Sequence, residues 1–291
     1  MSAKQEYKNK MIVVCSAVGG AGKTTVTVNL AALLAQNKIN TVLMDGDLQF
    51  GDMSLALDLK PSWTLKDLIE RNDIENVVGY YGYHSSGIRL LSAPERPEHA
   101  DLIQPDAFMS VARSVLADNR TLLIDTPYGL NELNLSLMEE ADEVLIVSTP
   151  GMAAVKNTKL MVETLEKLGL KEKCRLLINK ATSSSVLDIK DIPGLMDVKS
   201  VVLLPEEKHL PYTFDIGNPF VFSHPKLPFS KEMKKVGEQL GLLIDSIQIT
   251  SPINDFLKKV NRKASKVKSR RNNNEFINQA SIEGSAGSKS G

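Results

Sequence analysis

The chain has 291 residues, of which 42% are hydrophobic and 24% are charged, and its formal net charge is zero. These are ordinary values for a globular protein, and the length is sufficient for one large α/β domain with a buried core. The neutral total excludes a strong overall attraction to nucleic acid or to anionic membranes. It hides an asymmetry, because residues 251–291 carry a net charge of +6 and the preceding body carries −6.

Cysteine and histidine usage points to a reducing compartment and to no structural metal. Cys15 and Cys174 both lie in apolar runs that predict buried strands, and two distant buried thiols do not predict a disulfide framework. The four histidines show no metal-ligand spacing. No apolar segment precedes Met11, and no apolar run reaches the ~20 residues that span a bilayer. We therefore expect a cytoplasmic protein.

Apolar runs of strand length alternate along the chain with segments of helical periodicity. In chain order the sequence predicts a strand at 11–16, a helix at 23–36, strands at 41–44 and 88–91, a helix at 106–116, a strand at 121–125, a helix at 133–138, a strand at 143–148, a helix at 153–168, strands at 175–179 and 200–204, and a helix at 231–247. This alternation predicts an α/β fold with a mainly parallel, doubly wound sheet. Because the strands are almost entirely apolar, helices should cover both faces.

A glycine-rich segment runs from Ser16 to Thr25 with the sequence Ser-Ala-Val-Gly-Gly-Ala-Gly-Lys-Thr-Thr. It follows a predicted strand and opens a predicted helix, which is the setting of a phosphate-binding loop. Glycines let successive N–H groups point at one anion, and the helix N-terminus adds a positive dipole end. The residues expected to bind nucleotide here are Gly19, Gly20, Ala21, Gly22, Lys23, Thr24 and Thr25. The alternative is a glycine-rich turn that happens to precede a helix.

Carboxylates follow two of the predicted strands. Asp45 and Asp47 come directly after the strand at 41–44, and Asp125 ends the strand at 121–125. In open α/β sheets, ligands bind outside the carboxyl ends of the strands. A carboxylate placed there can orient an attacking water and accept its proton. The alternatives are an exposed acidic turn at the first position and a strand-terminal turn at the second.

The phosphate loop departs from the usual pattern, which has glycine six residues before the lysine, because Ala17 stands at that position. The segment resembles the deviant Walker A loop of the MinD/ParA family of P-loop ATPases. The resemblance implies ATP and Mg²⁺ as ligands and an ATP-dependent homodimer. In that family a signature lysine reaches the partner's nucleotide. Val18 stands at the matching position, so the resemblance does not carry that contact over, whereas Lys23 is kept.

The resemblance also implies roles for the carboxylates. Lys23, Asp47 and Asp125 are the expected catalytic residues, and Thr24, Asp47 and Asp125 are the expected metal ligands. Asp47 would orient and deprotonate the attacking water, Asp125 would hold magnesium through a water, and Gly129 would respond to the γ-phosphate.

Base recognition is implied by two further segments. Asn179 resembles the strand-end asparagine that hydrogen-bonds adenine in the family, and Pro205, within 204–207, resembles the loop that flanks the base. Asn179 could equally be a turn former. Lys180 is followed by Ala-Thr, so the guanine-specific Asn-Lys-x-Asp pattern is missing, which favours ATP over GTP.

Two segments, 47–52 and 91–98, resemble the CpaE/TadZ branch of pilus-assembly ATPases. Only ten residues precede the first predicted strand, so we do not expect the receiver-like domain that usually comes first in that branch. The function implied is a slowly hydrolysing dimerisation switch that positions or assembles a cell-envelope machine, such as a pilus or secretion system, with an unknown protein partner.

Two other classes remain open. A ParA-like partition ATPase would bind DNA non-specifically through surface Lys and Arg, which the basic end permits and the acidic body disfavours. A bacterial tyrosine kinase of related fold would carry a C-terminal tyrosine cluster, but the last tyrosine here is Tyr212.

The predicted domains are a short extension at 1–10, the P-loop ATPase domain at 11–247, a basic amphipathic segment at 248–271 and a disordered tail at 272–291. Apolar residues between 253 and 267 share one helical face, and eight Lys or Arg lie between 258 and 271. This composition predicts weak contact of 253–271 with the inner face of the cell membrane. The alternatives are a solvated tail or a helix that docks on protein or DNA.

Overall fold

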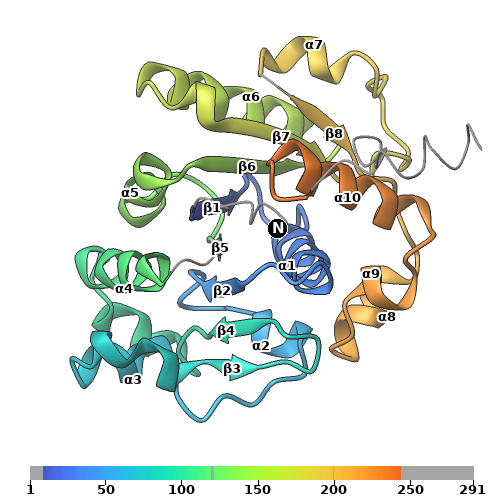
Figure 1. Cartoon of the computed structure of the whole chain (residues 1–291). Helices are drawn as coiled ribbons and strands as arrows, with labels where there is room; N and C mark the ends of the chain where they lie inside the picture. The colour runs from blue at the N-terminus through green and yellow to red at the C-terminus, as the bar shows by residue number, and fades with distance from the viewer. Residues whose placement is uncertain (1–8, 119–120, 199, 244–291) are drawn as a thin grey trace, which may run out of the picture. The chain divides into compact units, whose positions relative to one another are not determined.

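The computed structural model of the chain describes residues 9–118, 121–198 and 200–243. These form one eight-stranded sheet of order β3-β4-β2-β5-β1-β6-β7-β8 (Figure 1). Every strand pair is parallel except β3–β4, which confirms the predicted mainly parallel sheet. The strands are β1 (Lys10–Cys15), β2 (Thr41–Asp45), β3 (Gly82–Tyr83), β4 (Arg89–Leu91), β5 (Thr121–Asp125), β6 (Glu143–Ser148), β7 (Cys174–Ile178) and β8 (Val201–Leu203).

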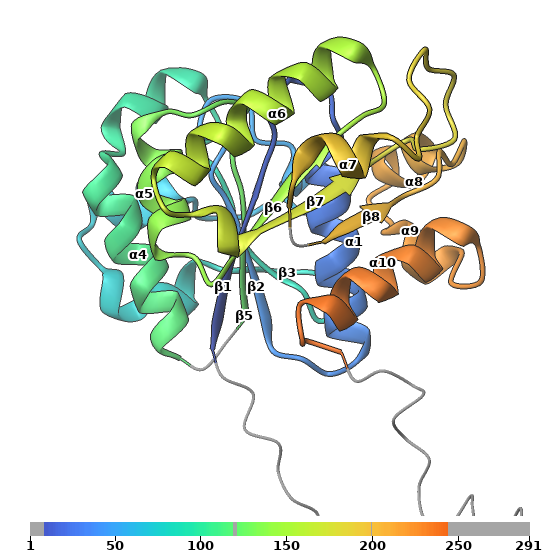
Figure 2. The ribbon, with the colours of Figure 1, turned by 90° about the horizontal axis from the view of Figure 1, so that it is seen from above.

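Helices cover both faces of the sheet, with α4, α5 and α6 on one side and α1 and α10 on the other (Figure 2). The helices are α1 (Lys23–Gln36), α2 (Met53–Ala56), α3 (Leu65–Glu70), α4 (Pro105–Ala117), α5 (Glu132–Glu140), α6 (Met152–Lys167), α7 (Ile192–Met196), α8 (Leu210–Asp215), α9 (Phe220–Ser223) and α10 (Pro228–Gln239). Three 3₁₀ turns complete the described elements: η1 (Ile74–Tyr80), η2 (Pro97–Leu102) and η3 (Lys171–Lys173).

The core has two parts because successive side chains of a strand point to opposite faces of the sheet. On β1, Met11 and Val13 are buried in the part under α4 and α5, whereas Ile12 and Val14 are buried in the part under α1 and α10. Strands that are apolar at every position therefore fill both parts. Burial on this scale is the main source of the fold's stability.

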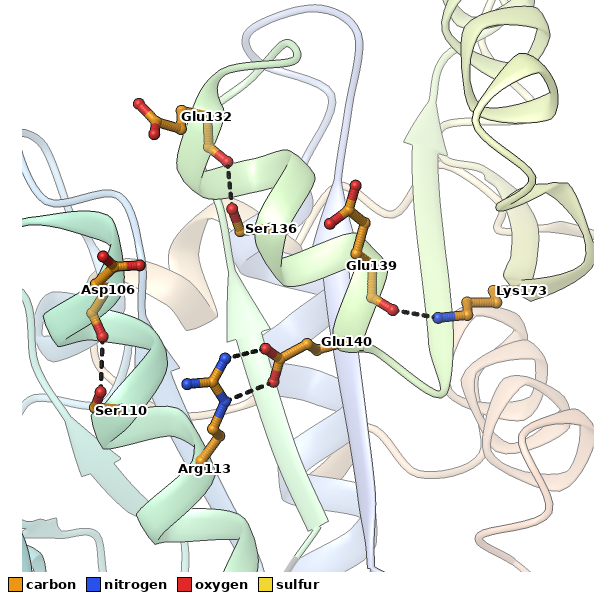
Figure 3. Close-up of polar contacts among 8 residues, drawn as sticks. All are labelled: Asp106, Ser110, Arg113, Glu132, Ser136, Glu139, Glu140 and Lys173. Atoms are coloured by element: carbon orange, nitrogen blue, oxygen red, sulfur yellow. Dashed lines mark hydrogen bonds and ion pairs between the residues drawn. The ribbon is translucent and has the colours of Figure 1, made fainter.

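The outer layer is tied together by polar contacts between helices (Figure 3). Arg113 of α4 makes a two-pronged ion pair with Glu140 of α5, with Nε donating to Oε2 at 3.0 Å. The Nζ of Lys173 donates to the backbone oxygen of Glu139 at 2.6 Å, which joins the 3₁₀ turn at Lys171–Lys173 to α5. Since these groups are exposed to solvent, which screens their charges, the contacts add little to the stability of the fold.

The predicted last helix, 231–247, is wrong at both ends. α10 begins at Pro228, whose missing N–H suits the first turn of a helix, and it ends at Gln239. Gly241 then adopts a φ of 66°, the left-handed conformation that commonly follows a helix. The segments 248–271 and 272–291 lie outside the described residues. The helices of the described residues are each too short or too polar to span a bilayer.

Candidate nucleotide-binding site

The glycine-rich loop begins where β1 ends and enters α1 at Lys23. Gly20 and Gly22 have φ values of 70° and 91°, which side-chain-bearing residues rarely adopt. A Cβ on Gly22 would also lie 2.3 Å from the Nδ2 atom of Asn179. The loop therefore needs glycine at this position for both conformation and space.

Asp125 lies at the end of β5, directly beneath the loop, and is 2% exposed. Its Oδ2 accepts a hydrogen bond of 2.5 Å from the hydroxyl of Thr24. Its Oδ1 is buried and has no hydrogen-bond partner within the described part of the chain. Burial raises the pKa of Asp125 to about 7, against the lowering effects of the Thr24 hydrogen bond and the Lys23 charge.

These groups fit Mg²⁺. The cation prefers oxygen ligands, usually binds through one or two carboxylates, and takes its other ligands from phosphates and water. The Thr24 hydroxyl and the unpartnered Asp125 oxygen are ligands of that kind. Within residues 9–118, 121–198 and 200–243, no three His, Cys, Asp or Glu side chains cluster to hold a metal by themselves. A cation here would therefore depend on the nucleotide's phosphates.

The raised pKa of Asp125 predicts a pH-dependent stability. The Asp125 carboxyl has a pKa of about 7 in the folded chain, against an ordinary value of 3.8. Its contribution to the stability of the fold is therefore fully present below pH ~4. That contribution is lost as the pH rises through about 7. At about 1.4 kcal/mol per pKa unit the effect is at most about 4 kcal/mol. We expect the free energy of unfolding of the nucleotide-free protein to fall over this range relative to Asp125→Asn. Urea denaturation of both proteins measures this, and a pH-independent difference would contradict it.

The loop after β2 folds around Asp45, a carboxylate that is 1% exposed. Burial, followed by the nearby charge of Asp125, raises its pKa well above the ordinary range. Its Oδ1 accepts from the N–H of Asp47 at 3.2 Å, and its Oδ2 accepts from the N–H of Met53 at 3.3 Å. Gly51 passes so close that a Cβ there would lie 2.4 Å from Asp45 Oδ2. Asp45 therefore fixes the start and the end of the segment that carries Asp47.

The loop after β5 is tied to the glycine-rich loop. Gly129 has a φ of 88°, and its N–H donates to the backbone oxygen of Ser16 at 2.8 Å. Asn134, at the start of α5, donates from Nδ2 to the backbone oxygens of Gly129 and Pro127, at 2.8 and 3.1 Å. A movement of Gly129 would therefore change hydrogen bonds to both the phosphate loop and α5.

A pocket of about 630 Å³ opens over these loops. Its lining includes Gly19, Gly20, Gly22, Lys23, Thr24, Thr25, Asp47, Phe50, Asp52, Tyr128, Asn179, Lys180, Glu206, Glu207, Lys208, Leu210, Pro211, Phe214 and Asp215. The lining thus combines a phosphate loop, carboxylates and apolar side chains of α8. This is the combination of polar anchor and apolar lining that is typical of a small-molecule site.

The structure brings most of the predicted site residues together. Lys23, Thr24 and Asp47 line the pocket, and Asp125 contacts it through Thr24. Ala21 is buried, and its backbone oxygen accepts from Asn179. Pro205 is not among the residues that line this pocket. Pro205 lines a neighbouring pocket beside β8 and α10. Glu206 and Glu207 line the pocket over the phosphate loop.

Several lining residues were not predicted. Phe50 and Tyr128 are 71% and 64% exposed. They belong to the two loops that carry the predicted carboxylates, so the signal available in the sequence was an aromatic residue in each of those loops. The sequence did not indicate the apolar lining residues of α8, which are Leu210, Pro211 and Phe214, because a six-residue helix is too short to show a helical period.

Val18, which replaces the signature lysine of the deviant Walker A loop, is half-buried. Its side chain packs against the part of the core under α1, and its backbone oxygen accepts from the Ser16 hydroxyl at 2.7 Å. The position is therefore used for packing here.

Comparisons with known proteins identify relatives of the chain by sequence and by fold. The sequence model of the AAA domain family matches residues 9–178. The chain is 28% identical over 244 residues to the septum site-determining protein MinD of Synechocystis, covering 79% of this chain and 90% of that protein. The cell division ATPase MinD of Pyrococcus furiosus is similar in structure, with a TM-score of 0.71 and 26% identity over 81% of this chain and 100% of the other. A ParA family ATPase of Chlorobium tepidum shares the fold, with a TM-score of 0.70 and 19% identity over 79% and 99% of the two chains.

Proposed function

Because the chain belongs to the AAA domain family, as a P-loop ATPase of the MinD/ParA type, we propose that it is a switch gated by ATP and Mg²⁺. The observation that carries this proposal is the contact of Thr24 with Asp125 at 2.5 Å beside a pocket that Lys23 and Asp47 also line. One set of side chains can then bind phosphates, hold a cation and activate a water.

Each residue has a distinct task in the proposed hydrolysis. Lys23 and the loop N–H groups bind the phosphates. Thr24 and ionised Asp125 would hold Mg²⁺, which neutralises charge on the phosphate oxygens when bound. Asp47 accepts the proton of the attacking water, because it lines the pocket and its backbone is fixed by Asp45.

The two loops around the pocket support a gated dimer. Phe50 and Tyr128 line the pocket and present largely exposed aromatic rings, and aromatic residues are enriched at the cores of protein interfaces. A contact of the γ-phosphate with Gly129 and of the attacking water with Asp47 would order these loops, as in other nucleotide switches. We place the homodimer contact on this face.

Sedimentation velocity with Mg²⁺ and ATP, ADP or no nucleotide tests the switch. We expect dimers with ATP and monomers otherwise. A charge-conserving replacement of both aromatics, Phe50→Ala with Tyr128→Ala, should lose the dimer at ATP concentrations that saturate the variant, whose ATP affinity is measured in parallel because both rings also line the pocket. A protein that binds ATP and stays monomeric would refute the gated dimer while leaving the nucleotide site intact.

Val18 predicts slow turnover. Without a lysine at this position, each nucleotide lacks a positive charge from the partner, and charges supplied in that way accelerate phosphoryl transfer by about 10³–10⁵ in other switches. We expect Val18→Lys to tighten ATP-dependent dimerisation or to raise turnover at least about tenfold. Phosphate-release assays measure the rate of turnover. Val18→Met is the control, because it replaces the branched valine by an unbranched side chain without adding a charge. Brisk turnover by the unmodified protein alone would contradict the prediction.

For the cellular role we propose the positioning or assembly of a cell-envelope machine such as a pilus or secretion system. Segments 47–52 and 91–98, which resemble the CpaE/TadZ branch, support it, and the first of them lies at the nucleotide pocket. A deletion strain should lose pili or secretion, and the wild-type gene but not Lys23→Ala should restore them. A defect in plasmid or chromosome partition instead would favour the ParA-like alternative.

Membrane contact through 253–271 stays a prediction, because that segment lies outside the described residues.

A further inference from the structure

Asn134, near the start of α5, is a fully buried side chain that holds the loop after β5. Its Nδ2 donates to the backbone oxygen of Pro127 at 3.1 Å and to that of Gly129 at 2.8 Å. An amide nitrogen carries two N–H groups, so each of them has one carbonyl as its acceptor. The amide must present its nitrogen to the loop, because Oδ1 in the same place would face two other acceptors. Both N–H groups of the side chain are therefore used to hold this loop.

The other polar atom of this amide contributes nothing to the hydrogen bonding. The Oδ1 of Asn134 is buried and has no hydrogen-bond partner among the residues that the structure describes. A buried acceptor without a partner destabilises a fold. What the side chain supplies at this place is therefore its pair of bonds to the loop, and the fold carries an unpaired oxygen to keep them.

The opposite side of the same loop is fastened to β1 and to the phosphate loop. Thr126 donates to a backbone oxygen of β1 with its N–H and its hydroxyl, at 3.1 and 3.0 Å. The N–H of Gly129 donates to the backbone oxygen of Ser16 at 2.8 Å. Between these attachments lies Tyr128, which lines the pocket. Asn134 therefore provides the attachment on the α5 side, and it helps to set where the loop lies beside the pocket.

The loop held in this way lies against the phosphate loop. A Cβ at Gly19 would be 3.8 Å from the ring of Tyr128, and both residues line the pocket. In a phosphate loop, the backbone N–H groups cradle the α- and β-phosphates, and the lysine reaches the β- and γ-phosphates. The phosphates of ADP are thus bound by the phosphate loop itself. The γ-phosphate of ATP is the group that remains for the loop after β5.

We infer that Asn134 is a positioning residue for recognition of the γ-phosphate: it holds the backbone of residues 127–129 where the loop can distinguish ATP from ADP. The inference rests on the proposed function, in which Gly129 responds to the γ-phosphate. Asn134 is not among the residues that line the pocket, so it acts through the loop and not by touching the nucleotide.

The test compares a nucleotide that has a γ-phosphate with one that lacks it. Isothermal titration calorimetry with Mg²⁺ would measure the affinities of ADP and of the non-hydrolysable ATP analogue AMP-PNP for the wild type and Asn134→Ala. The variant leaves two carbonyl oxygens of the loop without their donor, which predicts a loss of about tenfold in the affinity for AMP-PNP. The affinity for ADP should stay within about twofold, because the phosphate loop itself is unchanged.

Asn134→Asp is the second variant and serves if the alanine variant does not fold. Aspartate has nearly the same shape as asparagine but, when ionised, has no hydrogen to donate. An acidic side chain in the first turn of a helix is also favourable for the helix. We expect at least the same loss of affinity for AMP-PNP, because the carboxylate oxygens would face the two carbonyl oxygens of the loop.

Asn131 provides the matched control. It is exposed, it caps the N-terminus of α5, and its Oδ1 accepts from the backbone N–H of Asn134 at 2.8 Å. Asn131→Ala therefore weakens the start of α5 without removing a donor from the loop. It should lower the melting temperature but leave the affinities for AMP-PNP and ADP within about twofold. This control separates the positioning of the loop from a general loosening of α5.

The outcomes are distinct. A loss of affinity for AMP-PNP with ADP binding retained, in the Asn134 variants and not in Asn131→Ala, supports the inference. Equal losses for both nucleotides would show that Asn134 supports the whole pocket and would overturn it. Unchanged affinities in both Asn134 variants would overturn it as well, and so would the same γ-phosphate-specific loss in Asn131→Ala. A wild-type protein that binds neither nucleotide refutes the proposed function itself.

Discussion

Replacement of Lys23 by alanine should lower the affinity for ATP by at least about 30-fold and leave the fold intact. Lys23 begins α1 and lines the pocket beside Thr24, so its ammonium group can reach the phosphates of a nucleotide held by the loop. Removing one partner of a desolvated charge pair costs about 2–5 kcal/mol, and each 1.4 kcal/mol is a factor of ten in affinity. Isothermal titration calorimetry in the presence of Mg²⁺ measures this.

The control for this prediction is Lys159→Ala, which removes an exposed lysine of α6 and should not change the affinity. Circular dichroism should show equal helix content in both variants and the wild type. A second effect is expected at Asp125, because the Lys23 charge lowers the pKa of that carboxyl, and Lys23→Ala should therefore raise it. Binding of ATP by Lys23→Ala as tightly as by the wild type would refute the assignment of the phosphate loop.

The sheet and the phosphate end of the site could be predicted from the sequence because their signals are local. α1 has the predicted bounds, 23–36, since the loop that precedes it has a specific pattern that opens a helix. Asp45, Asp125 and Asn179 each end an apolar strand, and the carboxyl ends of parallel strands meet at one edge of a sheet. Their convergence then follows from topology alone.

The apolar part of the pocket lining could not be predicted because it depends on long-range packing. Leu210, Pro211 and Phe214 come from a helix of six residues that is placed by its contacts with α2 and α9. The same limit applies to the antiparallel β3, a strand of only two residues. Sequence reasoning identified Asn179 as a site residue, but its partner, the oxygen of Ala21, lies 158 residues away and is visible only in the structure.

Replacement of Asp47 by alanine should have the opposite signature to that of Lys23: binding of ATP retained and hydrolysis lost. The segment that carries Asp47 is held by Asp45, which accepts from the N–H groups of Asp47 and Met53. Removing the Asp47 side chain leaves those bonds in place. Among the described residues it removes one hydrogen bond, an exposed bond of 3.3 Å from the N–H of Phe50. The loop should therefore keep its shape around the nucleotide.

The expected loss of turnover in Asp47→Ala is about 10²–10⁴-fold, the usual contribution of a general base. Single-turnover hydrolysis measures the chemical step, and sedimentation velocity should show ATP-dependent dimers that persist because the nucleotide is not consumed. Asp52→Ala is the matched comparison, since it removes a carboxylate from the same loop and the same pocket, and it should lower turnover by less than about tenfold. If Asp47→Ala instead loses ATP binding, Asp47 supports the loop and the base is another group. If Asp52→Ala shows the larger loss of turnover, the catalytic assignment moves to Asp52.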